Sequence, residues 1–169
     1  ATILTARRNA NEAFRWVERG IDLAKRAPNS AMAGYQLAKL RRDLLAKLGR
    51  GHEARDAAWA EYREHPSTYT YDDLMKYVPK ADRAAWHEKA VEAAKGSDLD
   101  SLIELLLKTK ELERLASLVR GSSDDALENV SHYVTEPAAK KLAKTHPDVA
   151  ARLWCAQGLR IVNAKKSKY

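Results

Sequence analysis

The chain has 169 residues, of which 45% are hydrophobic and 31% charged, and its net charge is +7. A chain of this length buries enough surface to fold without a disulfide or a metal. Its composition excludes a disordered segment, and no apolar run approaches the roughly 18 residues that a membrane span needs.

The amino-terminal part predicts two amphipathic helices. The first covers residues 8–26, where apolar side chains follow a three-to-four spacing, and Pro28 ends it. Gly49 and Gly51 close the second helix, because glycine readily adopts the left-handed conformation at a helix end. The buried face of that second helix is a leucine stripe formed by Leu37, Leu40, Leu44, Leu45 and Leu48.

Two further helices follow before the middle of the chain. One carries Ala54, Ala57, Ala58 and Trp59 and runs to His65-Pro66, and a short one covers residues 71–78. Thr70 and Asp73 have the spacing of a capping pair and are expected to begin the short helix.

The rest of the chain continues in the same way. Ser97 and Asp100 repeat the capping spacing before another leucine-rich stretch. The predicted helices of this part cover residues 82–95, 99–109, 112–121, 122–134, 137–145 and 148–162. The sequence therefore predicts an all-α protein of about ten helices in a single domain over residues 1–169.

The joints between these helices recur at a regular spacing. They lie near Gly49, Lys80, Lys110 and His146, about thirty to thirty-six residues apart, with two helices in each unit. A period of this length is typical of an α-solenoid, in which each hairpin buries its apolar face against its neighbours. A compact bundle or an irregular helical domain is the alternative.

The first joint carries a family resemblance. Leu44-Leu45, Leu48-Gly49-Arg50 and Glu53-Ala54, followed by Trp59 and Pro66, resemble a tetratricopeptide (TPR) hairpin. In that motif a Leu-Gly turn precedes Glu-Ala, and a proline closes the unit. The resemblance implies a right-handed solenoid of stacked hairpins and a scaffolding role, with no catalytic residue and no cofactor.

The whole chain is also similar to bacterial helical-repeat proteins of unknown function, some of them associated with SWIM-type zinc fingers. In those proteins, segments like His146-Pro147 through Leu153 and Lys165 through Tyr169 lead into a further hairpin. The resemblance implies that the last hairpin is cut and that the chain is a fragment of a longer protein. It also implies an uncovered apolar face near Leu159 to Val162, through which two copies of the chain are expected to pair.

Residues capable of metal or covalent chemistry are scattered. The five histidines occur singly, without zinc-ligand spacing, so we expect no metal site. Cys155 follows Leu153 in an apolar stripe and is expected to be a buried thiol, and as the only cysteine it fits a reducing cytoplasm. The paired acids Asp72-Asp73 and Asp124-Asp125 are expected at helix starts, where negative charge is favourable. We therefore expect no enzyme.

Aromatic side chains divide into two groups. Large rings beside alanines are expected to fill gaps between helices in the core. The four residues of this kind are Trp16, Trp59, Trp86 and Trp154. Tyrosines beside a lysine suit a partner-binding surface instead, on the concave side that the first helix of each hairpin lines. The contact residues predicted for a peptide or partner helix are Tyr35, Lys39, Arg42, Tyr71, Lys76 and Tyr77.

The charge distribution gives an alternative function. Residues 1–50 and 137–169 each carry a net charge of +7, whereas residues 51–95 carry −2 and residues 96–136 carry −5. Basic ends favour a nucleic-acid backbone, but the acidic middle opposes one that follows the whole chain. The basic candidates are Arg7, Arg8, Arg15, Arg41, Arg42, Lys140, Lys141, Lys144, Lys165, Lys166 and Lys168. A helical accessory domain of a larger enzyme is a further alternative.

Overall fold

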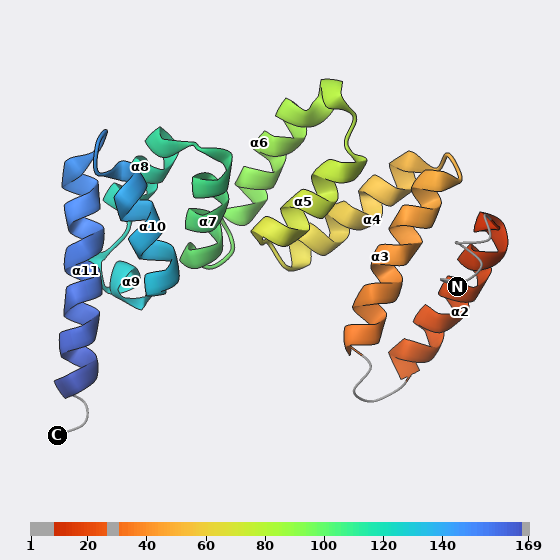
Figure 1. The fold of residues 1–169 in the computed structure, drawn as a ribbon, viewed down its shortest axis with the longest axis horizontal. Helices are drawn as coiled ribbons and strands as arrows, with labels where there is room; N and C mark the ends of the chain where they lie inside the picture. Colours follow the sequence, from red (N-terminus) through yellow and green to blue (C-terminus); the bar gives the residue numbers. More distant parts are fainter. Residues whose placement is uncertain (1–8, 27–30, 167–169) are drawn as a thin grey trace. The chain divides into compact units, whose positions relative to one another are not determined.

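The computed structural model describes residues 9–26 and 31–166, and all regular structure in them is helical (Figure 1). The all-α prediction and the expected number of helices are confirmed for these residues. One short 3₁₀ helix, Lys80–Asp82, precedes α6. The α-helices are α2 (Ala10–Arg26), α3 (Ala31–Lys47), α4 (Gly51–Glu64), α5 (Thr68–Tyr77), α6 (Arg83–Ala94), α7 (Leu99–Thr109), α8 (Leu112–Gly121), α9 (Asp124–Asn129), α10 (His132–Leu142) and α11 (Pro147–Lys166).

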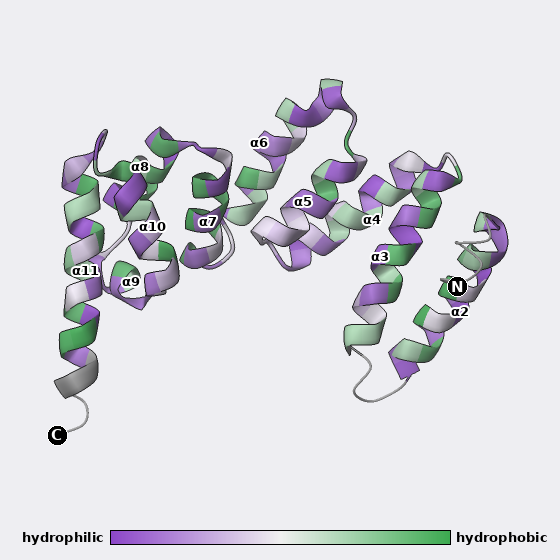
Figure 2. Ribbon diagram, in the orientation of Figure 1, coloured by the Kyte–Doolittle hydropathy of each residue, from purple (hydrophilic) through white to green (hydrophobic). Residues whose placement is uncertain are grey.

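The contacts within the chain define two compact units. Unit 1 comprises Ala1–His65 and Asp72–Trp86, and unit 2 comprises Pro66–Tyr71 and His87–Tyr169. The division between the units falls inside α5 and inside α6. Figure 2 shows apolar and polar residues alternating along the helices of both units, as expected for amphipathic helices.

The core of unit 1 is formed largely by the hairpins that join α2 to α3 and α3 to α4. Ala13 and Val17 of α2 are fully buried against Leu44 of α3. Leu45 of α3 and Tyr62 of α4 are fully buried as well. The leucine stripe predicted for the second helix is therefore partly interior: Leu44 and Leu45 are buried, whereas Leu37 and Leu40 are half-buried beside them.

In unit 2 the helices pack in two groups of neighbours. α7 lies against α8 and α10, and α11 packs against α8, α9 and α10. The fully buried leucines Leu105, Leu115, Leu142 and Leu153 come from four of these helices. Because α11 contacts three other helices, its first half is the central packing element of this unit.

The two best-formed joints have left-handed residues. Gly49 has a φ of 77° between α3 and α4, and Lys110 has a φ of 63° between α7 and α8. The backbone N–H of Lys110 donates to the carbonyls of Leu106 and Leu107, which ends α7. The predicted joint at His146 lies between α10 and α11, and Lys80 begins the 3₁₀ helix that separates α5 from α6. The predicted stop at Pro28 lies outside the described residues.

Helix boundaries near residue 130 differ from the prediction. Residues 122–134 do not form one helix, because α9 ends at Asn129 and Ser131 caps α10 through a bond from the Tyr133 N–H. Pro137 was expected to begin a helix and instead lies inside α10.

The two predicted capping pairs are wrong by a few residues. Ser67, not Thr70, precedes α5, and the Ser67 and Thr70 side chains accept bonds from each other's backbone N–H. At α7 the cap is Asp98, whose carboxylate accepts from the Ser101 N–H at 2.8 Å. Asp100 accepts instead from the backbone N–H of Ser131 at 2.8 Å. In both cases a different polar side chain, one to three positions away in the sequence, accepts the backbone bond at the start of the helix.

The tryptophans were predicted to be core residues, and two of the four are not. Trp59 and Trp86 are half-buried in unit 1, with an edge-on ring contact at 5.6 Å. Trp16 and Trp154 are about half exposed, at 50% and 46%.

No helix in the described residues is long and apolar enough to cross a membrane.

Candidate functional site

The polar cluster around Asp43 brings together residues of α3 and α5 in unit 1. The Tyr77 hydroxyl donates to Asp43 Oδ1 at 2.8 Å, and the Lys76 ammonium donates to the same oxygen. Lys39 lies one turn before Asp43 on α3, and its charge also acts on the Asp43 carboxylate. Three of the six predicted contact residues therefore surround one carboxylate, which we call the Asp43 cluster (Lys39, Asp43, Lys76 and Tyr77).

The electrostatics of the cluster follow from its partial burial. Burial alone raises the pKa of Asp43, but the hydrogen bonds from Lys76 and Tyr77 and the charges of Lys76 and Lys39 outweigh it, so the pKa is lowered. The pKa of Tyr77 is raised, chiefly by burial and by its bond to the Asp43 carboxylate. Asp43 is therefore charged and Tyr77 neutral at physiological pH.

A surface hollow of about 440 Å³ adjoins this cluster. Its apolar lining comes from α3, and its charged lining includes two lysines, one from each helix. The lining residues are Leu40, Asp43, Leu44, Ala46, Lys47, Lys76 and Tyr77. Lys76 remains half exposed, at 51% of its side chain, so its ammonium can donate to a bound group while it keeps its bond to Asp43.

The other three predicted contact residues lie elsewhere. The structure places Arg42 in the interior, where its Nη2 lies 2.8 Å from Asp73 Oδ2 and only 3% of its side chain is exposed. Tyr35 lines a separate hollow between α2 and α3 that also reaches Glu61 of α4. The Tyr71 hydroxyl bonds to His87 within unit 2 at 2.8 Å. Within unit 1, Arg42 and Tyr35 therefore do not share a surface with Lys39, Lys76 and Tyr77.

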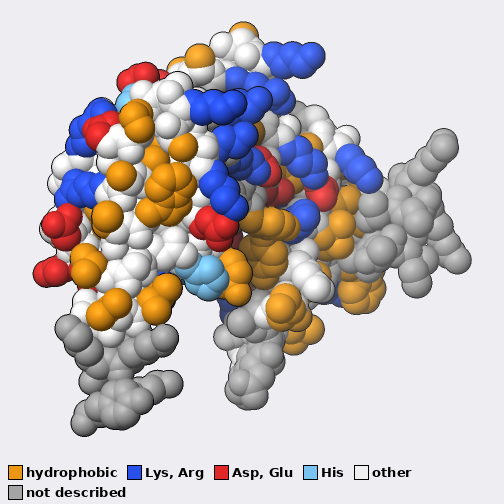
Figure 3. All heavy atoms as spheres, turned by 60° about the vertical axis from the view of Figure 1, so that its left-hand side comes forward, with side chains coloured by type: hydrophobic (Ala, Val, Ile, Leu, Met, Phe, Trp, Pro, Cys, Tyr) orange, Lys and Arg blue, Asp and Glu red, His pale blue; other side chains and the backbone are white. Residues whose placement is uncertain are grey.

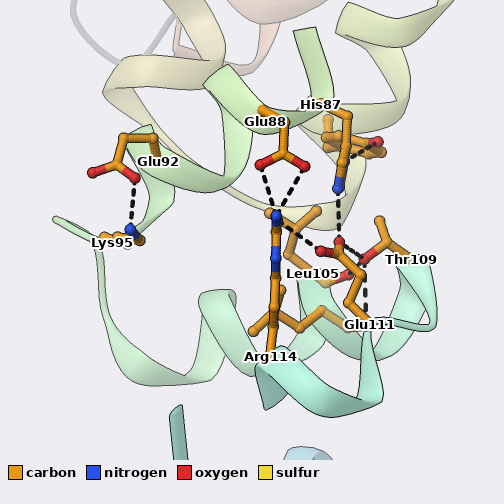
Figure 4. A network of polar contacts seen from close by, with 10 residues as sticks. His87, Glu88, Glu92, Lys95, Leu105, Thr109, Glu111 and Arg114 are labelled. Atoms are coloured by element: carbon orange, nitrogen blue, oxygen red, sulfur yellow. Dashed lines mark hydrogen bonds and ion pairs between the residues drawn. The ribbon is translucent and has the colours of Figure 1, made fainter. Parts of the chain in front are cut away.

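A second polar network lies in unit 2, where His87 of α6 meets Glu111 (Figure 4). His87 Nε2 lies 2.7 Å from a Glu111 oxygen, and Tyr71 bonds to the other ring nitrogen. The Thr109 hydroxyl donates to the same Glu111 oxygen at 2.7 Å. Because both ring nitrogens have partners in the chain, this histidine links helices and has no free nitrogen for proton transfer to a substrate.

Arg114 of α8 adds Glu88, a second residue of α6, to the network (Figure 4). Its Nη1 lies 2.8 Å from Glu111, and its Nη2 donates to both oxygens of Glu88, at 2.8 and 3.0 Å. The bonds from Arg114 lower the pKa of Glu88. Sequence reasoning missed this network, since its bonded residues are between 2 and 26 positions apart and share no motif.

Beside this network lies an open hollow of about 560 Å³ on α6, α7 and α8. It has an apolar floor and a rim on which acids and bases pair with one another, as Glu92 does with Lys95 at 2.6 Å. The floor and rim residues are Val91, Leu102, Leu106, Leu118, Glu88, Glu92, Lys95, Glu113, Arg114 and Ser117. Four of the five rim charges pair as Glu88–Arg114 and Glu92–Lys95, and the fifth, Glu113, lies 3.1 Å from His146.

Several predicted functional residues have structural surroundings that change their interpretation. Cys155 was expected to be buried and is exposed, because α11 turns its Leu153 face to the core. Among the basic candidates, Arg41 pairs with Glu18 and Lys140 with Glu136. No group of three or more metal-binding side chains occurs in the described part of the chain.

Comparison with known proteins gives one match. The model of a family of unknown function, DUF6880, matches residues 1–169, and the chain belongs to this family. The expected membership of an uncharacterised family is confirmed, whereas the TPR and SWIM resemblances remain predictions. No curated protein and no solved structure matches the chain.

Proposed function

We propose that this member of the DUF6880 family is a non-catalytic protein–protein interaction scaffold that binds an acidic peptide or partner helix beside the Asp43 cluster. The observation that carries the proposal is the convergence of Lys39, Lys76 and Tyr77, from two helices, next to a hollow of about 440 Å³. The proposal includes the TPR-like, right-handed solenoid, whose hairpins present their first helices to a partner.

The chemistry of the hollow supports a partner with apolar and acidic side chains. Leu40 and Leu44 of α3 offer apolar contact, while Lys47 and Lys76 line the same hollow and carry positive charge. The Asp43 carboxylate is already occupied by hydrogen bonds from Lys76 and Tyr77. The charge that the hollow offers to a partner therefore comes from its lysines and is positive. A carboxylate that reaches Lys76 forms a charge-assisted hydrogen bond, which is stronger than a bond between neutral groups.

The test compares two charge-reversal variants of equal size. Lys39→Glu/Lys76→Glu alters the Asp43 cluster, and Lys141→Glu/Lys144→Glu, at exposed positions of unit 2, is the matched control. Circular dichroism and thermal melting first establish that both variants keep the helical fold. The protein is then used to recover partners from a lysate, and acidic peptides from each recovered partner are titrated against the purified variants.

We expect the wild type and the control to bind the same acidic peptide and the Asp43-cluster variant to bind it at least about tenfold more weakly, a difference of about 1.4 kcal/mol. Equal binding by a folded Asp43-cluster variant contradicts the proposed surface.

A further inference from the structure

The second half of α11 has an apolar stripe with no partner in the described chain. Val149, Ala150, Leu153 and Ala156 are buried and face the core of unit 2, whereas no residue after Ala156 is buried among those described. On the opposite side, Trp154, Leu159, Ile161 and Val162 are 46–54% exposed. Figure 3 shows apolar side chains running along this helix, above the grey atoms at its end.

The stripe has a centre of symmetry in its sequence. Trp154 and Val162 lie four residues on either side of Gly158, and Cys155 and Ile161 lie three residues on either side. At about 100° and 1.5 Å per residue, these five positions share one face of the helix. Because these positions are spaced symmetrically about Gly158, they suit a two-fold axis at the glycine, across which positions before it on one copy meet positions after it on the other.

Glycine at the centre allows a close approach. A Cβ built at Gly158 has nothing within 4 Å, so the glycine is not required by the chain's own packing. Two helices crossing at a glycine come nearer than helices with larger side chains at the contact. Packing within the described chain therefore makes no use of the small size of Gly158, which leaves room for a neighbour from outside the chain.

The stripe is also free of charge that would oppose self-pairing. Between residues 149 and 164 the charged residues are Arg152 and Arg160. Arg152 bonds to Asp124 at 2.7 Å and to carbonyl oxygens of its own chain, and Arg160 donates to the Val130 carbonyl at 2.6 Å. Both arginines face the body of unit 2, so pairing two stripes brings no like charges together.

We propose that α11 is a homodimerisation helix, which packs antiparallel against α11 of a second copy with the two helices crossing at Gly158. In this arrangement Trp154 faces the partner's Ile161, and Cys155 faces the partner's Val162. Four half-exposed apolar side chains per copy bury less than the roughly 1,200 Å² of a stable interface, so the dimer is weak and depends on concentration.

The register gives a specific cross-linking test. With helix axes about 8 Å apart, the Cα atoms of Cys155 and the partner's residue 162 lie about 5–6 Å apart, which is a disulfide distance. The two Cys155 residues are about 11 Å apart, too far to be bridged. Val162→Cys is therefore expected to form a covalent dimer under mild oxidation, whereas the wild type and the Cys155→Ser/Val162→Cys variant are not.

Two controls make the result decisive. Lys141→Cys, at an exposed position of α10, tests random collision, and Gly158→Glu puts a charge at the crossing while improving helix propensity. In sedimentation, the wild-type chain is expected to form dimers on concentration toward about 1 mM, and Gly158→Glu is expected to remain a monomer. The proposal is overturned by a monomeric wild type throughout this range, by dimers of Gly158→Glu, or by equal cross-linking of Lys141→Cys and Val162→Cys.

Discussion

The ion pair between Arg42 and Asp73 gives the sharpest prediction for stability. It joins α3 to α5 in unit 1, and both side chains are almost fully buried, at 3% and 9% exposed. The Arg42 Nε is buried without a hydrogen-bond partner, so the pair is imperfectly compensated. Replacing Arg42 with methionine keeps an unbranched apolar chain but leaves the Asp73 carboxylate buried without its counter-ion.

We expect Arg42→Met to lower the free energy of unfolding by about 3–5 kcal/mol, the cost of an unpaired buried charge. Since urea slopes are about 1–3 kcal/mol/M, the midpoint falls by at least about 1 M. The double variant Arg42→Met/Asp73→Leu removes the orphaned charge and is expected to recover most of the loss, because apolar replacements of buried pairs are often neutral or stabilising.

Urea unfolding followed by far-ultraviolet circular dichroism measures these changes. The control is Lys140→Met, which removes an exposed partner of Glu136 and is expected to leave the midpoint unchanged. A midpoint for Arg42→Met equal to that of Lys140→Met refutes the reasoning, and so does a double variant as unstable as the single one.

Two further predictions concern helix ends. Lys110→Gly is expected to stabilise the chain by about 1 kcal/mol, because a lysine in the left-handed conformation costs about 1–2 kcal/mol. Gly49→Ala is expected to destabilise it, because it puts a side chain at a left-handed position that glycine occupies without this cost. Thermal melting measures both changes, and a shift of the same sign in the two variants contradicts the interpretation. Asp98→Ala is expected to cost about 1 kcal/mol through loss of the α7 cap. The pKa of Asp98 is lowered from 3.8, chiefly by the Ser101 N–H, so the cap's stabilisation is present at neutral pH and is lost as the pH falls below this value. Unfolding curves of wild type and Asp98→Ala should therefore converge in acid, and a constant difference down to the lowest pH argues against the charged cap.

Helix type was predictable from the sequence because it rests on local patterns. The leucine spacing up to Leu48 and the glycine at position 49 predicted α3 and its end closely. The predictions failed where the pattern allowed a choice between neighbouring polar residues, as at Ser67 and Thr70. They also failed for Trp154, because periodicity gives the apolar face of a helix but not which neighbour covers it.

The partner-binding residues depended on long-range geometry that one sequence does not contain. Lys76 and Tyr77 could be chosen as a lysine beside a tyrosine, but nothing local indicated that Asp43, more than thirty positions earlier, holds both. For Arg42, helix periodicity did contain a signal: it lies three and two residues before Leu45 and Leu44, and with Leu45 it shares the inner side of α3. The buried acid that allows an arginine there, Asp73, is on another helix.

The division of the chain into two units has a practical consequence for dissecting it. The polypeptide passes from one unit to the other after His65, after Tyr71 and after Trp86, and the last two crossings lie within α5 and α6. No single cut yields both units whole, and a fragment that ends at residue 65 lacks Asp73 and leaves Arg42 without its counter-ion. Truncations that seek a minimal binding fragment of unit 1 therefore need to extend through α6, and point variants are the safer way to assign function to either unit.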